Sequence, residues 1–126
     1  MSEPGVIWNR AALESGGSSP REGDRALAAL LLAHGLVMNG GVAHAAGVLS
    51  AEQLLAAIAG YRFFGLGEVA ETLRSARSGL SDESSEAADQ RYWSVVPSDD
   101  SIASRFEAVF SSRPELFAPV EKSDER

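Results

Sequence analysis

Apolar positions recur with helical spacing along most of the chain, and no segment shows the sustained alternation that is typical of β-strands. The clearest example lies just before Pro114, where four apolar residues fall at i, i+4, i+7 and i+8, on one face of a helix. They are Ile102, Phe106, Val109 and Phe110. Six or so segments of this kind predict an all-α fold, a compact irregular bundle of about six short helices.

The most apolar segment predicts a central helix that is capped by Asp24 and runs to Met38. Its apolar residues cover most of the circumference, as expected for a helix that is surrounded by others. Asn39-Gly40-Gly41 ends it, because glycine adopts the left-handed conformation beyond a helix end at little steric cost. The apolar part, residues 26–38, is about half of the roughly 20 residues that a membrane-spanning helix needs, so no membrane span is expected.

Shorter helices are predicted between the glycine turns. One covers residues 42–49, and the next begins at Ser50, where Gln53 three residues later fits a capping box. Its buried side is expected to consist of Leu54, Leu55, Ile58, Tyr61 and Phe64.

The second half of the chain predicts three further elements. A helix covers residues 68–77, and a polar helix runs from Ser81 to about Tyr92. Residues 93–96 form a short β-branched stretch, and Asp99 or Asp100 is expected to cap the last helix.

The chain is expected to divide into three parts. Residues 1–23 form a flexible or loosely docked N-terminal segment, in which a short helix packs Trp8 onto the body. Residues 24–119 form the helical domain, and residues 120–126 form a frayed, charged tail. The N-terminus lacks the basic and apolar stretches of a secretory signal, which favours a cytoplasmic location.

Charge adds the first functional indication. The 126 residues include 18 acids, 11 bases and no cysteine, for a formal net charge of -7. Without cysteine, disulfides, thiolate metal sites and a cysteine nucleophile are excluded. Residues 1–80 hold seven acids and six bases, whereas residues 81–126 hold eleven acids and five bases. No direct nucleic-acid binding is expected, because phosphate contacts need concentrated lysine and arginine.

The excess acid suggests a binding surface. Asp82, Glu86 and Asp89 lie at i, i+4 and i+7, on one side of the predicted polar helix. Like charges at this spacing destabilise a helix by a few tenths of a kcal/mol per pair, so local folding gives little reason for them. The three charges span roughly 10 Å, close to the charge density of one DNA strand, which carries a phosphate about every 3.4 Å.

We call this side, with its neighbouring acids and one aromatic residue, the acidic face: Asp82, Glu83, Glu86, Asp89, Trp93, Asp99 and Asp100. It is the predicted surface for a basic protein partner, with Trp93 as a candidate anchor because interfaces are enriched in aromatic residues. Two simpler interpretations stay open. The face is a solvated acidic surface, or its acid pairs only cap helix starts.

The two histidines, His34 and His44, supply a competing hypothesis. They lie ten residues apart with no carboxylate at ligand spacing, so they match no zinc signature, and no metal, cofactor or catalytic residue is assigned. In the alternative, a small-ligand-binding or enzymatic helical domain uses His34 or His44 in an interhelical pocket. A third hypothesis is a homo-oligomer, such as a homodimer, formed through the apolar region at Trp93.

Three stretches together resemble the bacterial DNA mimic protein family, in the form of the DNA-mimic-protein-nineteen C-terminal-like domain. They are residues 36–42 (LVMNGGV), residues 60–70 (GYRFFGLGEVA) and the acidic helix from Asp99 that ends in PELFAP at residues 114–119. The resemblance covers about residues 24–119.

This resemblance implies a small α-helical domain. The activity that it implies is imitation of duplex DNA by surface carboxylates, which occupy the DNA-binding site of a basic regulatory protein. The leading hypothesis is therefore a non-catalytic acidic protein-binding domain, and a DNA mimic is the specific form that the resemblance implies.

Overall fold

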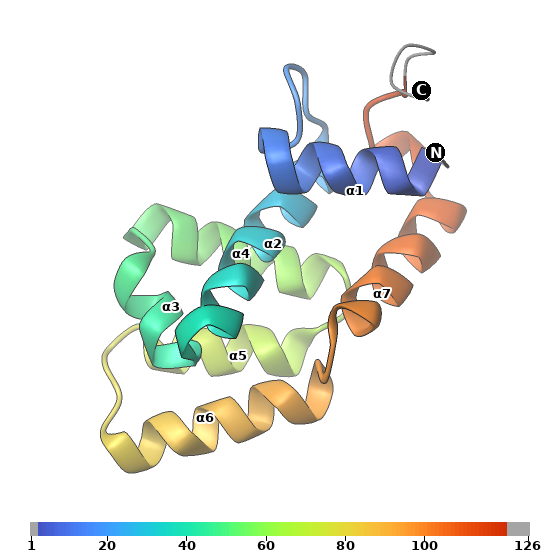
Figure 1. The fold of residues 1–126 in the computed structure, drawn as a ribbon. Coiled ribbons are helices and arrows are strands. Elements are labelled where there is room, and N and C mark those ends of the chain that lie inside the picture. The colour runs from blue at the N-terminus through green and yellow to red at the C-terminus, as the bar shows by residue number, and fades with distance from the viewer. Residues whose placement is uncertain (1–2, 121–126) are drawn as a thin grey trace.

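A computed structural model describes residues 3–120, and within them the chain forms seven α-helices, one 3-10 helix and no strand (Figure 1). The helices are α1 (Glu3–Glu14), α2 (Glu22–Gly40), α3 (Val42–Val48), α4 (Ala51–Phe63), α5 (Gly67–Ala76), α6 (Asp82–Val95), α7 (Asp99–Ser112) and η1 (Pro114–Leu116). The predicted all-α bundle is confirmed. Of the predicted tail, residues 121–126 lie outside the described residues.

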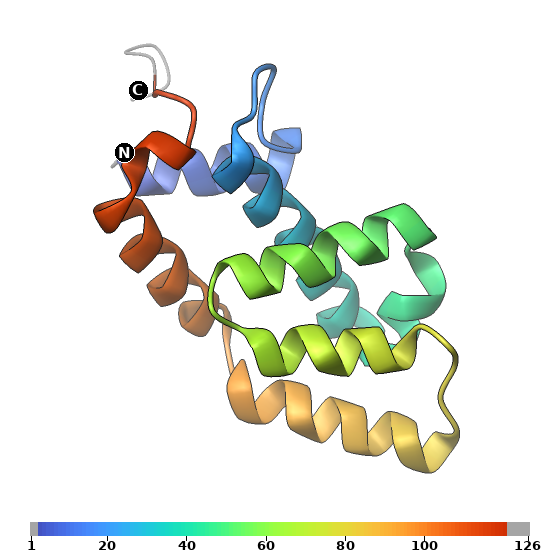
Figure 2. The same cartoon turned by 180° about the vertical axis from the view of Figure 1, so that it is seen from behind.

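Helix α2 is the centre of the fold and packs on α1, α3, α4 and η1. Seen from behind, α4, α5 and α6 lie side by side as one layer, and α2 passes on its far side (Figure 2). Helix α4 approaches α2 so closely that a Cβ at Gly60 would lie 2.5 Å from the backbone oxygen of Ala26. Glycine is needed there because any side chain would push the two helices apart.

The core forms along the inner side of α2, where Leu27, Leu30, Ala33 and Val37 are buried. This confirms the predicted central helix. Across the described residues, no helix is long and apolar enough to span a membrane. Helix α1 covers the end of the bundle, and its Trp8 ring packs against Phe106, as expected for a short helix at this position.

The start of α2 differs from the prediction. The helix is capped by Arg21 and begins at Glu22, so Asp24 is its third residue and not its cap. The Asp24 carboxylate is buried and accepts a hydrogen bond from the backbone N–H of Arg21 at 2.9 Å. At the other end α2 continues to Gly40, and Gly41 takes the positive φ of 92° that ends it.

Helix α4 confirms the predicted capping box and corrects its buried side. Ser50 Oγ accepts the Gln53 N–H at 3.1 Å, and Gln53 Oε1 accepts the Ser50 N–H at 2.9 Å. Leu55, however, is 47% exposed. The buried residues Leu54 and Ile58 are one helical turn apart, and Leu55 is rotated by about 100° from Leu54 and about 60° from Ile58.

Helix α6 continues to Val95, so the predicted β-branched stretch at residues 93–96 is wrong. Ala88, Tyr92 and Val96 are buried at four-residue spacing, and this packing outweighs the weak preference of a valine pair for strands. The predicted cap of α7 is wrong by one or two positions. Ser98 is the N-cap, and Asp99 and Asp100 are the first two helical residues.

Candidate functional site

Three acids of the acidic face lie in the first turns of α6, where Asp82, Glu83 and Glu86 are exposed. None of the three takes part in the ion pairs of the described residues. The N-cap is Ser81, whose Oγ accepts the Ser84 N–H at 3.1 Å. The backbone is therefore capped by a serine, and the carboxylates of these acids remain available to solvent or to a partner.

Asp89 differs from the other acids of α6 because it is half-buried and bonded to another helix. Its Oδ1 accepts the backbone N–H of Val42, the first residue of α3, at 2.8 Å. A Cβ at Gly41 would lie 3.0 Å from both carboxylate oxygens. Asp89 thus satisfies a free N–H at the start of α3 and fixes α6 beside the turn between α2 and α3.

Asp99, the first residue of α7, binds the buried histidine of α2. His34 Nε2 lies 2.7 Å from Asp99 Oδ1, and the Asp99 side chain is still 61% exposed. On the other side of the ring, His34 Nδ1 lies 2.6 Å from the hydroxyl of Tyr92, which lies 2.6 Å from the hydroxyl of Tyr61. We call this series Tyr61, Tyr92, His34 and Asp99 the hydrogen-bond chain. It connects α4, α6, α2 and α7.

The direction of each hydrogen bond follows from chemistry. An ionised carboxylate only accepts, so His34 Nε2–H donates to Asp99, and in the neutral tautomer of the imidazole that carries this proton Nδ1 accepts. Tyr92 donates to His34, and Tyr61 donates to the Tyr92 oxygen. Burial raises the pKa of Tyr61 and of Tyr92 well above the usual range of a phenol. Both hydroxyls therefore keep the protons that this arrangement requires.

Trp93 continues the row of acids along α6. Residues 82, 86, 89 and 93 lie at i, i+4, i+7 and i+11, on one side of the helix. The Trp93 side chain is 36% exposed, and its ring packs edge-on against Tyr92 and His34, with centroids 5.2 and 6.4 Å away. The structure therefore brings Trp93 and Asp99 to the same histidine.

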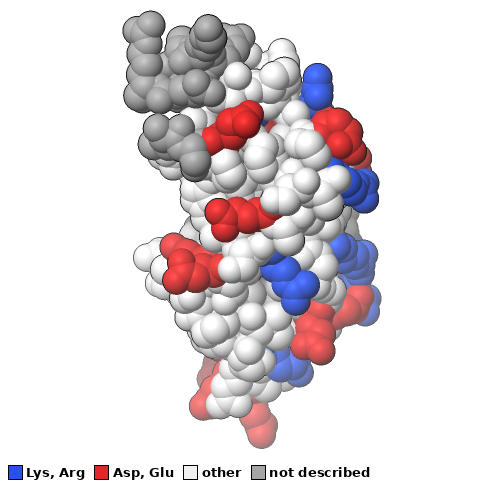
Figure 3. Space-filling view, turned by 90° about the vertical axis from the view of Figure 1, so that its right-hand side faces the viewer, with Lys and Arg blue, Asp and Glu red and all other residues white. Residues whose placement is uncertain are grey.

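Asp100 is exposed next to Asp99 and has no ion pair within residues 3–120. The molecule nevertheless carries mixed charge. Figure 3 shows one face on which carboxylates form separate groups, with arginine side chains among them toward one edge. Acidic and basic side chains are thus interspersed on this face.

The histidines have structural contacts. His34 is 4% exposed and both of its ring nitrogens are hydrogen-bonded. His44 packs against the α2–α3 turn, where a Cβ at Gly40 would lie 2.5 Å from its ring. Four surface grooves of about 310 to 560 Å³ lie elsewhere, and neither histidine lines any of the four. Among the described residues, no three histidine or carboxylate side chains are placed to hold a metal ion.

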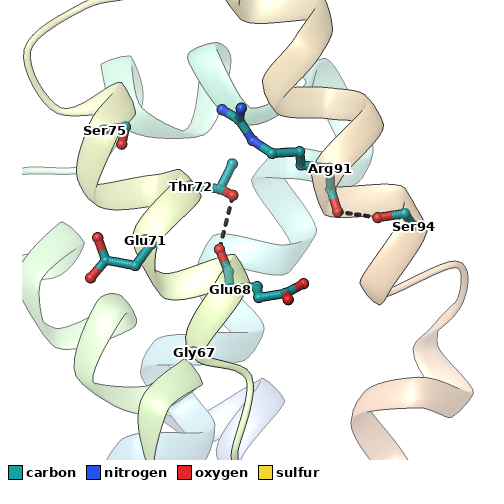
Figure 4. Close-up of a pocket in the computed structure, with 7 residues that line it drawn as sticks. All are labelled: Gly67, Glu68, Glu71, Thr72, Ser75, Arg91 and Ser94. Carbon is teal, nitrogen blue, oxygen red and sulfur yellow. Dashed lines mark hydrogen bonds between the residues drawn. The ribbon is translucent and has the colours of Figure 1, made fainter.

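The largest of these grooves lies between α5 and α6 and has a volume of about 560 Å³ (Figure 4). Arg91 extends from α6 toward α5, Glu68 points toward α6, and Glu71 points away from the groove. Two lining hydroxyls already bond helix carbonyls: Thr72 donates to Glu68 O and Ser94 to Arg91 O. This groove was not found from the sequence, and its mixed charge sets it apart from the acidic face.

A model of the DMP19-like protein family matches residues 19–122 of the chain. The match includes the segment on which the resemblance to DNA mimic proteins rests, and it confirms that resemblance. No curated protein and no solved structure matches the chain.

Proposed function

The chain belongs to the DMP19-like protein family, and from this membership we propose that it is a non-catalytic acidic protein that binds a basic regulatory protein. In the specific form of the proposal, the acidic face imitates duplex DNA and occupies the DNA-binding surface of that partner. Charged surfaces of opposite sign steer such encounters and suppress binding to the wrong partner.

The observation that carries the proposal is the row of unpaired carboxylates at the start of α6. Asp82, Glu83 and Glu86 are exposed, without ion pairs among the described residues, and not needed as helix caps. Their mutual repulsion costs a few tenths of a kcal/mol per pair at helical spacing. A basic partner would offset that repulsion, which supports a role for the cluster in binding.

The remaining acids of the acidic face support the proposal in a second way. Asp89 and Asp99 each use Oδ1 to bond another helix. A carboxylate has about four lone-pair sites, so each still has accepting capacity. Because these bonds hold α6 and α7 in place, the free carboxylates are presented from a rigid surface, which lowers the entropic cost of binding.

The test is capture of partners with the tagged protein from a lysate of the source cell, at low and at moderate salt. We expect a basic DNA-binding protein that added salt releases, because screening weakens exposed charge pairs. With that partner purified, duplex DNA should compete with the acidic protein. Competition by DNA would support mimicry, whereas simultaneous binding of DNA would contradict it.

Charge reversal locates the surface. Asp82→Lys with Glu86→Lys should weaken the complex, and Glu52→Lys is the control, because Glu52 is an exposed acid on α4 without an ion pair among the described residues. Because the control changes the net charge by half as much as the double variant, a loss of binding free energy half as large in the control would mean that only net charge matters. Unchanged affinity in the double variant would refute the proposed surface.

A further inference from the structure

We propose that Trp93 and Asp99 together form a receiving site for one arginine side chain of the partner. This inference rests on the proposed function, because it assumes that the acidic face binds a basic protein. It adds a specific chemistry to that surface: a preference for arginine over lysine at one position.

The geometry that carries the proposal is the shared contact with His34. The Trp93 ring packs edge-on against the imidazole at a centroid distance of 6.4 Å, and Asp99 Oδ1 lies 2.7 Å from Nε2 of the same ring. An indole of α6 and a carboxylate of α7 thereby contact the same imidazole, although they belong to different helices. His34 is a positioning residue in this arrangement.

Both groups are open to a partner. About a third of the Trp93 surface and most of the Asp99 side chain are exposed. Asp89 lies one helical turn before Trp93 on the same side of α6. The exposed indole therefore has a carboxylate before it on its own helix and a second one at the start of α7.

This combination suits a guanidinium group better than an ammonium group. Guanidinium is planar, stacks on aromatic rings and donates in a fork that matches a carboxylate. The ammonium of lysine is a compact, strongly hydrated charge that loses more hydration when it leaves water. Asp99 keeps Oδ2 to accept one guanidinium N–H, because His34 bonds to Oδ1.

The hydrogen-bond chain keeps the receiving site in position. His34 is buried, and Tyr92 and Tyr61 behind it are fully buried. Asp99 is therefore connected to the core through three ordered side chains, and an incoming arginine meets a carboxylate whose orientation is already set. Preorganisation of this kind favours binding because less freedom is lost.

The test uses two synthetic peptides of equal charge, hexa-arginine and hexa-lysine, and the full chain with Trp8→Phe. In this background Trp93 is the only tryptophan, since the chain has two, and its fluorescence reports on the site. Calorimetry gives the two affinities. We expect hexa-arginine to bind roughly two- to fivefold more tightly, the factor of an exposed cation–π contact.

Variants separate the site from general acidity. Trp93→Leu keeps an apolar side chain, and Asp99→Asn keeps an oxygen that can accept from His34, so the fold is retained and circular dichroism checks it. Each should lower the arginine-to-lysine ratio toward one. Glu52→Gln, which removes a distant carboxylate, should lower both affinities without changing the ratio.

The outcomes distinguish this inference from the proposed function. Equal binding of the two peptides, or an arginine preference that survives Trp93→Leu, would overturn the arginine site and leave the proposed acidic surface standing. Failure of both peptides to bind at low salt would overturn both. The site is supported if the arginine preference is lost in Trp93→Leu and in Asp99→Asn but is kept in Glu52→Gln.

Discussion

Arg10 of α1 and Asp24 of α2 form a buried ion pair, with Nη2 donating to Oδ1 at 2.9 Å. The Asp24 side chain is completely inaccessible to solvent. Its other oxygen accepts the backbone N–H groups of Arg21 and Ala118, at 2.9 and 2.7 Å. One carboxylate therefore joins the N-terminal helix, the start of the central helix and the chain beyond η1.

Asp24→Asn should destabilise the protein by about 3 kcal/mol, because removing one charge of a buried pair leaves the other uncompensated. Urea unfolding followed by circular dichroism measures the change. The control is Glu14→Gln, an exposed acid at the end of α1, the helix that carries Arg10, and it should stay within about 0.5 kcal/mol of the parent. Equal stability of the two variants would show that the ion pair contributes little.

The two tyrosines should resist ionisation in the folded protein. Burial raises the pKa of Tyr61 and of Tyr92 above the usual phenol value of about 10. A group whose folded pKa is raised contributes stability that is present below its unfolded pKa and is lost as pH rises through the folded one. Stability should therefore fall above about pH 10.

Tyrosinate absorbance measures this directly, since the chain has two tyrosines and both belong to the hydrogen-bond chain. We expect little tyrosinate at about pH 10.5 in the native protein, against more than half ionisation in urea, where phenols titrate near pH 10. A native titration curve that coincides with the curve in urea would contradict the described burial.

The hydrogen-bond chain predicts unequal effects for two similar substitutions. Tyr92→Phe leaves His34 Nδ1 and the Tyr61 hydroxyl without a partner, and a buried polar group without a partner costs about 1–3 kcal/mol. Tyr61→Phe removes only the hydroxyl that bonds the Tyr92 oxygen, so it should destabilise the protein less. In the double variant the two losses should not add, because the residues share one network.

Denaturant unfolding of the four proteins in this cycle gives the coupling. If Tyr61→Phe is the more damaging change, or if the two losses add fully, Tyr92 does not hold the central place in the hydrogen-bond chain.

Local spacing in the sequence predicts contacts within one helix, but it does not predict contacts between helices. The capping box of Ser50 and Gln53 could be predicted because both residues lie within one helical turn. The contact between His34 and Asp99 spans 65 positions. Periodicity shows which side of a helix is apolar, but the packing of different helices decides which residues meet, and this is why His34 could not be paired with a carboxylate from sequence.

At Asp24 and at the end of α6, packing against distant residues likewise overrides what the local sequence predicts. An acid just before an apolar segment is a good N-cap candidate, yet Asp24 is drawn inward by Arg10 and Ala118, which lie far away in sequence. Trp93 was predicted to leave the helix, and it stays helical because Tyr92 and Val96 are buried on either side of it.

Asp89 allows folding and binding to be separated at a single position. Its Oδ1 accepts the Val42 N–H at 2.8 Å and so caps α3 from a neighbouring helix. Asp89→Ala removes the acceptor and should cost about 1 kcal/mol, the usual effect of losing a cap. Asp89→Asn keeps an acceptor and removes the charge, so it should be close to the parent in stability while binding a basic partner more weakly. Urea unfolding and calorimetry with hexa-arginine measure the two effects. Equal stability of the alanine and parent proteins would mean that the cap is dispensable, and undiminished binding by the asparagine variant would remove Asp89 from the acidic face.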